Sequence, residues 1–287
     1  MGPDRVVATG GVWRCAPDGM SFTNEWMVGT AAKSGGGSWS FNLEHRGHLD
    51  YGNYYSGKTS GDSLHPASGR RIVYGEVQPI KTNEAGATSW MGVCGSHHTF
   101  PRELVLDDQL GLRVLPIPEL ASLRQSSAQA VGTSAVVVGS QVELRMSCFY
   151  TPSVALEFGF EVLRSADGRE HLRVGLSNRD VATAPPGLRL FAQHVGICDG
   201  QVNGAAICNT TQVAPIPAAA IAAHHVNLTV VVDGGLIESF AAESVALTSL
   251  ADPSTATAPE HRMARVFGTG VHPNAVQCAA QAWRLAL

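Results

Sequence analysis

The fold is decided by the stretch Ala135-Val-Val-Val-Gly-Ser-Gln-Val-Glu-Leu-Arg145 and by the similar segments that follow it. Apolar residues there occupy alternate positions or short continuous runs, as in strands with one or both faces buried. The same kind of segment recurs at 156–163, 171–175, 226–232 and 279–285. Asp167-Gly168 and Asp233-Gly234 favour tight turns between such strands. Many short strands separated by turns predict a β-sandwich.

The first 124 residues also predict strands, but with more frequent breaks. Glu25-Trp-Met-Val-Gly29 and Arg71-Ile-Val-Tyr74 are typical short strands, and Ser34-Gly-Gly-Gly-Ser38 is a typical loop. In Leu115-Pro-Ile-Pro-Glu-Leu-Ala-Ser-Leu-Arg124, two prolines exclude a central strand and favour an extended connector. We therefore expect two domains, residues 1–124 and 125–287.

Composition limits the classes of partner. Lys and Arg number 20 against 24 Asp and Glu, a formal net charge of −4, so nothing attracts nucleic acid or an anionic membrane surface. No apolar run approaches the roughly 18 residues that a transmembrane helix needs, and no signal peptide is visible. No cofactor is indicated.

The six cysteines leave the compartment and the disulfide pairing open. Cys198 and Cys208 flank a polar, glycine-containing stretch that could be a hairpin closed by a disulfide. Asn209-Thr-Thr211 and Asn227-Leu-Thr229 fit the N-glycosylation acceptor pattern. Both features point outside the cytosol, whereas the first residues of the chain do not.

Two motif matches lack the context that their chemistry requires. Gly52-Asn-Tyr-Tyr-Ser-Gly-Lys-Thr59 fits the phosphate-binding loop pattern, but the residues at 60–66, which include Gly61 and Pro66, cannot sustain the helix that must follow it. Cys94-Gly-Ser-His97-His98 holds two types of metal ligand, but a zinc site needs about four ligands and no second group of ligands is visible in the sequence. We expect neither a nucleotide site nor a metal site.

Several segments carry a family resemblance, and they occur in the family's order. They are Leu49-Asp-Tyr-Gly-Asn-Tyr-Tyr-Ser-Gly-Lys-Thr59, Arg70-Arg-Ile-Val-Tyr-Gly75, Pro101-Arg-Glu-Leu-Val-Leu-Asp107, Val232-Asp-Gly-Gly-Leu-Ile-Glu-Ser-Phe240 and Ala282-Trp283. These resemble the "DYG..YASKT", "RRILWGW", "PREL.LD", "VDHSIVEVF" and terminal "AW" motifs of glycoside hydrolase family 32, the invertases and fructan hydrolases.

The resemblance implies an all-β protein, with the last blades of a five-bladed β-propeller followed by a C-terminal β-sandwich. It implies hydrolysis of β-fructofuranosyl linkages in sucrose or fructans with retention, without a cofactor, in an extracellular or vacuolar compartment. Retaining glycosidases need two carboxyl groups about 5–5.5 Å apart, one as nucleophile and one as proton donor.

The catalytic carboxylates of the family are not found in this sequence. The "NDPNG" and "RDP" motifs are absent, so the chain is expected to begin after the point where they should lie. The "ECPD" motif aligns with Trp13-Arg14-Cys15-Ala16-Pro17-Asp18, which puts Arg14 at the position of the acid/base glutamate. Arg14 cannot release a proton near neutral pH. We therefore assign no catalytic residue, and expect activity to be impaired.

The candidate substrate-binding residues are Asp50, Asn53 and Asp18. Asp50 matches the family aspartate that borders the sugar subsites, although it could equally be a turn residue. Asn53 stands where sucrose-preferring members often carry Lys or Arg, so the resemblance argues against a preference for sucrose and leaves fructan-type ligands open. Asp18 lies near the mismatched acid/base motif.

Three interpretations stay open. The chain is an impaired family member, a non-catalytic carbohydrate-binding or interaction protein, or a fragment of a full-length β-fructofuranosidase. A partial propeller would leave an open blade edge with apolar surface. Residues 1–124 alone are then expected to aggregate or dimerise, and residues from about 125 onward to fold alone.

Overall fold

The computed structural model describes residues 5–16, 19–59, 69–77, 80–82, 88–90, 97–125, 127–179, 187–202, 205–208, 211–221, 223–251, 262–270 and 274–286. Within these ranges the chain is built of strands, apart from the short 3-10 turns η1 (Pro118–Leu123) and η2 (Ala218–Ala220). None of the helical segments described is long and apolar enough to cross a membrane. The predicted all-β class is confirmed.

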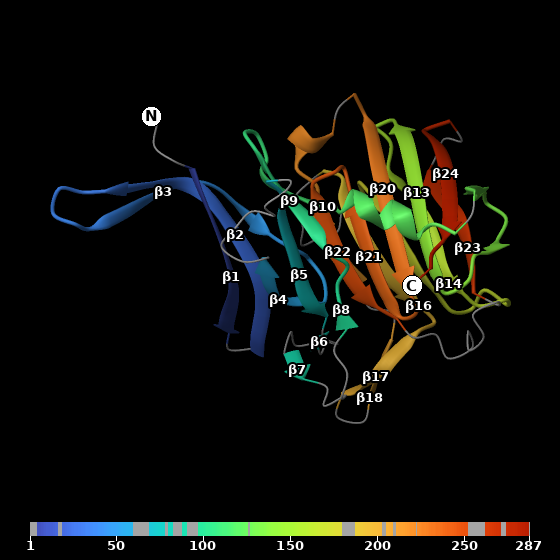
Figure 1. Cartoon of the computed structure of the whole chain (residues 1–287). Coiled ribbons are helices and arrows are strands. Elements are labelled where there is room, and N and C mark those ends of the chain that lie inside the picture. The colour runs from blue at the N-terminus through green and yellow to red at the C-terminus, as the bar shows by residue number, and fades with distance from the viewer. Residues whose placement is uncertain are drawn as a thin grey trace.

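The first part of the chain forms two main antiparallel sheets (Figure 1). One has the order β1-β2-β3, with bounds Arg5–Ala16, Gly19–Lys33 and Trp39–His48. The other has the order β10-β9-β5-β4, with bounds Gly111–Pro116, Arg102–Asp107, Arg71–Val77 and Tyr54–Thr59, and β8 (His97–His98) also pairs with β5. β6 (Ile80–Thr82) and β7 (Thr88–Trp90) form a separate pair. Sheets of this size suit propeller blades, and that assignment stays a prediction.

One face of the β1-β2-β3 sheet presents apolar side chains to solvent. Trp39, Phe41 and Leu43 alternate along β3, with exposed fractions of 70%, 42% and 47%. Leu43 lies opposite Gly29 of β2, which in turn lies opposite Val6 of β1, so the apolar face extends across all three strands. Figure 1 shows the β2–β3 hairpin projecting away from the rest of the molecule.

The second part is a sandwich of two six-stranded sheets. The first has the order β11-β24-β13-β20-β21-β22, with bounds Gln129–Ala130, Val276–Arg284, Gln141–Tyr150, His225–Asp233, Leu236–Ala241 and Val245–Leu250. The second has the order β12-β23-β14-β15-β16-β19, with bounds Val136–Val137, Met263–Gly270, Leu156–Arg164, His171–Ser177, Arg189–Val195 and Thr211–Pro215. The predicted sandwich is confirmed.

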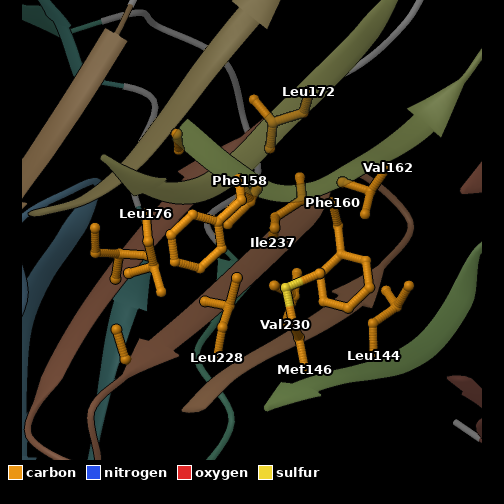
Figure 2. Packing of buried hydrophobic residues seen from close by; sticks show 14 of the residues in the cluster. Leu144, Met146, Phe158, Phe160, Val162, Leu172, Leu176, Leu228, Val230 and Ile237 are labelled. Atoms are coloured by element: carbon orange, nitrogen blue, oxygen red, sulfur yellow. The ribbon is translucent and has the colours of Figure 1, made fainter. Parts of the chain in front are cut away.

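The main core lies between these two sheets. Phe160 of β14 points toward Leu144 and Met146 of β13, and all three are at most 2% exposed (Figure 2). Successive strand residues face opposite sides, so the alternate residues 143, 145 and 147 of β13 lie on the outer face of the sheet. Burying each large apolar side chain contributes about 1.5–3 kcal/mol, which makes this cluster the main source of stability.

A disulfide that the sequence did not assign joins the two neighbouring strands β13 and β24. Cys148 and Cys278 lie directly opposite each other in register and are bonded across a sequence separation of 130 residues. The expected hairpin is also present, since β17 (Cys198–Val202) pairs with β18 (Ala205–Cys208) and places Cys198 opposite Cys208. A disulfide at that second position stays a prediction.

The connector between the two parts packs on the sandwich. Leu120 of η1 shares a small core with Val231 and Leu285. The amide of Ala286 donates to the carbonyl of Leu123 at 2.8 Å. The segment before residue 125 is therefore joined to the sandwich by apolar contacts as well as by the chain.

Candidate functional site

The loop that carries Asp50 and Asn53 lies along one edge of the sandwich and covers it. It runs from the end of β3 to β4, and β22 is the last strand of the first sandwich sheet. The amides of Tyr51 and Asn53 donate to the carbonyls of Ala246 and Thr248 at 3.2 and 2.8 Å. An edge strand presents unpaired backbone groups, and this loop satisfies part of that edge.

Gly52 is required by the closeness of that approach. A Cβ atom at residue 52 would lie 1.9 Å from the carbonyl oxygen of Thr248. Any larger residue would push the loop away from β22. The loop would then lose the position that directs Asp50 into the interior.

The Asp50 carboxylate is fully buried and accepts four hydrogen bonds. The donors are the amide of Gly52 at 2.6 Å, the amide and hydroxyl of Thr248 at 3.0 and 2.7 Å, and Nη1 of Arg102 at 2.8 Å. Its side chain is 0% exposed. A buried carboxylate is tolerated only when paired and hydrogen-bonded in this way.

Arg102 of β9 joins Asp50 to the sandwich. Its Nε and Nη2 donate to Oε2 of Glu238 on β21 at 3.0 and 2.8 Å, and Nη2 also donates to the Thr248 hydroxyl at 2.6 Å. The guanidinium lies 4.8 Å from the ring centre of Tyr54 and 5.3 Å from that of Phe240. We call Asp50, Arg102, Glu238 and Thr248 the Arg102 cluster. It is the polar centre of the contact between the two parts of the chain.

The Arg102 cluster holds two carboxylates and one guanidinium. Burial lowers the pKa of Arg102, but the charges of Glu238 and Asp50 outweigh it and hold that pKa above its ordinary value. Burial raises the pKa of Glu238, and the opposing charge of Arg102 does not cancel the effect. Burial also raises the pKa of Tyr54 to about 12. Arg102 therefore stays charged in the interior, where it is paired with both carboxylates.

Asp50 and Glu238 are close together, but they are not arranged as a glycosidase pair. Both point at the same guanidinium, and both side chains are 0% exposed. A retaining pair must flank the scissile bond of a bound sugar. The cluster therefore supports the contact between the two parts of the chain.

Residues 119–283 match the family model described as glycosyl hydrolases family 32 C terminal. The chain belongs to this family. It is 33% identical over 122 residues to the beta-fructofuranosidase insoluble isoenzyme 4 of Oryza sativa subsp. japonica. The aligned segment covers 42% of this chain and 19% of that protein. It is 32% identical over 121 residues to the cell wall isozyme of Zea mays beta-fructofuranosidase. That segment covers 41% of this chain and 19% of the relative.

Solved structures show the same fold over nearly the whole of this family 32 chain. The exo-inulinase of Aspergillus awamori superposes with a TM-score of 0.68 at 17% identity, over 98% of this chain and 53% of that one. The fructan 1-exohydrolase IIa of Cichorium intybus superposes with a TM-score of 0.61 at 17% identity, over 93% and 56%. This family 32 chain thus spans about half the length of these solved relatives.

Asn53 contacts the second sandwich sheet. Its side chain is 8% exposed, and its Oδ1 accepts a hydrogen bond at 2.7 Å from Gln212 of β19. The Ser249 hydroxyl of β22 donates to the other end of the Gln212 amide. The loop thus contacts both sheets of the sandwich through Asp50 and Asn53. Their roles in sugar binding stay predictions.

The structure places Arg14 away from this loop and describes no position for Asp18. Arg14 lies in β1 opposite Ser21 of β2, whereas the end of β3 that precedes Asp50 lies opposite Glu25. Four residues along a strand span about 13 Å. Asp18 lies outside the described residues. Asp50 and Asn53 thus lie together on the loop at residues 49–53, whereas Arg14 lies further along the β1-β2-β3 sheet.

A small hollow opens beside Asp50. Its volume is about 210 Å³, and it is lined by Glu25, Arg46, Gly47, His48 and Tyr51. The His48 and Tyr51 rings meet edge to face at 4.8 Å. Glu25, which the sequence patterns did not single out, is the only carboxylate in that lining. One carboxylate does not meet the requirement for a pair.

The two motif matches carry no site in the part of the chain that the structure describes. Lys58 and Thr59 are paired with β5 as part of strand β4, where a phosphate-binding loop would need the start of a helix. His97 and His98 are exposed in β8, and Cys94 lies outside the described residues. No three metal-ligating side chains gather among the described residues.

Proposed function

We propose that this chain is the C-terminal portion of a β-fructofuranosidase-type glycoside hydrolase. It supplies the β-sandwich and the adjoining propeller-type sheets, and the catalytic carboxylates are supplied by another segment. Sucrose or a fructan is the substrate of the assembled enzyme. The family match over residues 119–283 supports this assignment.

The Arg102 cluster is the observation that carries the proposal. The side chains of Asp50 and Glu238 have no exposed surface, and both are paired with Arg102. Arg14, at the position of the acid/base glutamate, has a side chain that stays charged. What these residues can do is hold the sandwich against the first sheets. The function of the chain is then to fix the scaffold on which a sugar site is built.

The loop at residues 49–53 has a positioning role in this proposal. Asp50 and Asn53 are nearly fully buried, so they act on a sugar through the path of the loop. Tyr51 lines the small hollow and is the member of the loop that would touch a ligand. Asn53 argues against a preference for sucrose, and fructan-type ligands stay part of the proposal.

An activity assay tests this function directly. The purified chain is incubated with sucrose and with inulin, and the fructose and glucose released are measured against a heat-denatured blank. We expect no release above the blank. Release that scales with protein concentration and disappears in an Asp18→Asn variant with unchanged melting temperature would contradict the proposal. Transcript sequence encoding "NDPNG" and "RDP" in frame upstream would establish the fragment interpretation.

A non-catalytic carbohydrate-binding role is the second candidate. It is favoured by a groove on the sandwich, outside the Arg102 cluster, that is lined by both apolar and polar side chains. Saturable binding of a saccharide without turnover, in a chain with no upstream catalytic segment, would favour this role over the first.

A further inference from the structure

The exposed apolar face of the β1-β2-β3 sheet is built around one row of residues that crosses the three strands. Val6 of β1, Gly29 of β2 and Leu43 of β3 lie side by side in this central row. Val6 is 39% exposed and Leu43 is 47% exposed. Phe41 lies against Gly29, where a Cβ atom would come within 2.8 Å of the Phe41 ring. Met27, which is 40% exposed, extends the face on the other side of the row. A contiguous exposed apolar face is typical of an interaction site.

The half of this face toward the β2–β3 hairpin is aromatic and carries one positive charge. Phe41 lies opposite Ala31, and Trp39 lies opposite Lys33. Nζ of Lys33 lies 6.0 Å from the centre of the Trp39 ring. Trp39 is 70% exposed, and the hairpin that carries it projects from the molecule (Figure 1). This half therefore offers two rings and an ammonium group to a partner.

The half on the other side of the central row is polar and hollowed. His48 of β3 lies opposite Glu25 of β2, and Arg46 precedes His48 on the same face. These three residues also line the hollow of about 210 Å³ beside Tyr51. Its volume is below the roughly 300 Å³ at which sites for small molecules begin, so it suits one inserted side chain. This half therefore offers a carboxylate, a guanidinium and a recess.

We propose that two copies of the chain associate through this face as a two-fold symmetric dimer. Two β-sheets pack face to face about 10 Å apart. A two-fold axis that crosses the strands at the central row sets the aromatic half of each copy against the polar half of the other. The central row then meets its own copy, so that Leu43 packs on Leu43 of the partner subunit.

The opposite chemistry of the two halves makes these contacts complementary. The ring of Phe41 lies over the guanidinium of the partner's Arg46, as in a cation–π contact. Trp39 enters the partner's hollow. Lys33 faces the partner's Glu25, since each lies four residues along β2 from the central row. Each contact occurs twice, as an interface between two identical surfaces requires.

The sheet is large enough for a dimer of moderate affinity. Its strands contain 12, 15 and 10 residues. With about 3.3 Å per residue along a strand and about 4.8 Å between strands, each residue covers about 16 Å² of the sheet. One face then measures about 600 Å², and two apposed faces bury about 1,200 Å². Specific interfaces bury roughly 1,200–2,000 Å², so we expect a dimer that dissociates on dilution.

Sedimentation equilibrium of the full chain over a range of concentrations measures this association. We expect a monomer–dimer equilibrium with a dissociation constant in the micromolar range. Lys33→Glu and Glu25→Lys should each weaken the dimer at least tenfold, because each variant sets like charges against each other at both contacts. An equimolar mixture of the two variants should regain the wild-type affinity, because each chain then meets the opposite charge on the other. A change in the fold of one variant cannot produce this rescue.

An aromatic pair of variants tests the inserted side chain. Trp39→Ala should abolish the dimer. The matched control is Phe149→Ala, which removes a ring that is 60% exposed on the sandwich and should leave the dimer unchanged. Because Trp39 fills the hollow beside Tyr51, the dimer and a ligand at Tyr51 exclude each other.

Three outcomes overturn the proposal. A chain that stays monomeric at every concentration leaves the face to another occupant, such as the segment that carries the catalytic carboxylates. Association that both charge variants retain, or that their mixture fails to restore, contradicts the two-fold arrangement. Association that survives Trp39→Ala contradicts the insertion into the hollow. None of these results alters the outcome of the fructose-release assay, so this proposal and the proposed function fail separately.

Discussion

Replacing Arg102 with leucine should destabilise the whole chain. The substitution removes four hydrogen bonds, two to Glu238 and one each to Asp50 and Thr248, and leaves two buried carboxylates without a counter-charge. Breaking a buried ion pair by removing one partner costs about 3–5 kcal/mol. Native domains are stable by only about 5–15 kcal/mol, so the free energy of unfolding should fall by a large fraction.

The measurement is urea unfolding followed by circular dichroism and tryptophan fluorescence. The control is Arg169→Ala, because Arg169 is 88% exposed and lies 3.5 Å from Asp167. A surface pair of this kind contributes at most about 1 kcal/mol. A second control adds Glu238→Leu to the Arg102 variant. Stability should partly return, because one uncompensated charge has been removed.

The loss should also depend on pH. Burial already raises the pKa of Glu238, and without Arg102 it rises further. A carboxyl group with a raised folded-state pKa contributes stability below its unfolded value, about 4.3, and loses it as pH rises through the folded value. The deficit of the Arg102 variant should therefore be largest near pH 7 and shrink toward pH 4. A loss no larger than that of Arg169→Ala, or one independent of pH, would refute the reasoning.

Three further predictions concern the disulfide, the apolar face and the separate parts. Reduction should lower the melting temperature of the wild type by more than that of a Cys148→Ala/Cys278→Ala variant, because the Cys148–Cys278 disulfide closes a loop whose length is worth up to about 5 kcal/mol. Phe41→Ser removes part of the exposed apolar face of β3 and should reduce concentration-dependent light scattering. The control is Leu106→Ser, because Leu106 is similarly exposed, at 44%, but lies outside that face. Residues 125–287 should fold alone with a lower melting temperature; an unfolded fragment would contradict this.

The strands of the sandwich could be predicted because their signal is local. Alternating apolar residues and Asp-Gly turns indicate β13, β14, β15 and β20 within a few residues. The disulfide could not be predicted in the same way. Cys148 and Cys278 are 130 residues apart, and only the register of β13 against β24 brings them together. Pairing of strands that are distant in sequence is not encoded in any single segment.

The contacts of the candidate residues were also beyond the sequence. Asp50 was singled out from its motif alone, and its partners Arg102 and Thr248 are 52 and 198 residues away. Their side chains meet because the β3–β4 loop lies along the edge strand β22. Arg102 lies in a motif that the sequence displays, but its burial, which requires a charged partner, is visible only in the structure.

The Arg102 cluster explains why several separate motifs share one family resemblance. Asp50 comes from the first motif, Arg102 from the Pro101-Arg-Glu-Leu segment and Glu238 from the 232–240 segment, and all three meet in one buried ion pair. Each side chain needs the other two, because a buried charge without its partner is costly. The motifs therefore depend on one another through a contact between the two parts of the chain. Residues that identify a family of enzymes can thus do so because they hold the sandwich against the first sheets.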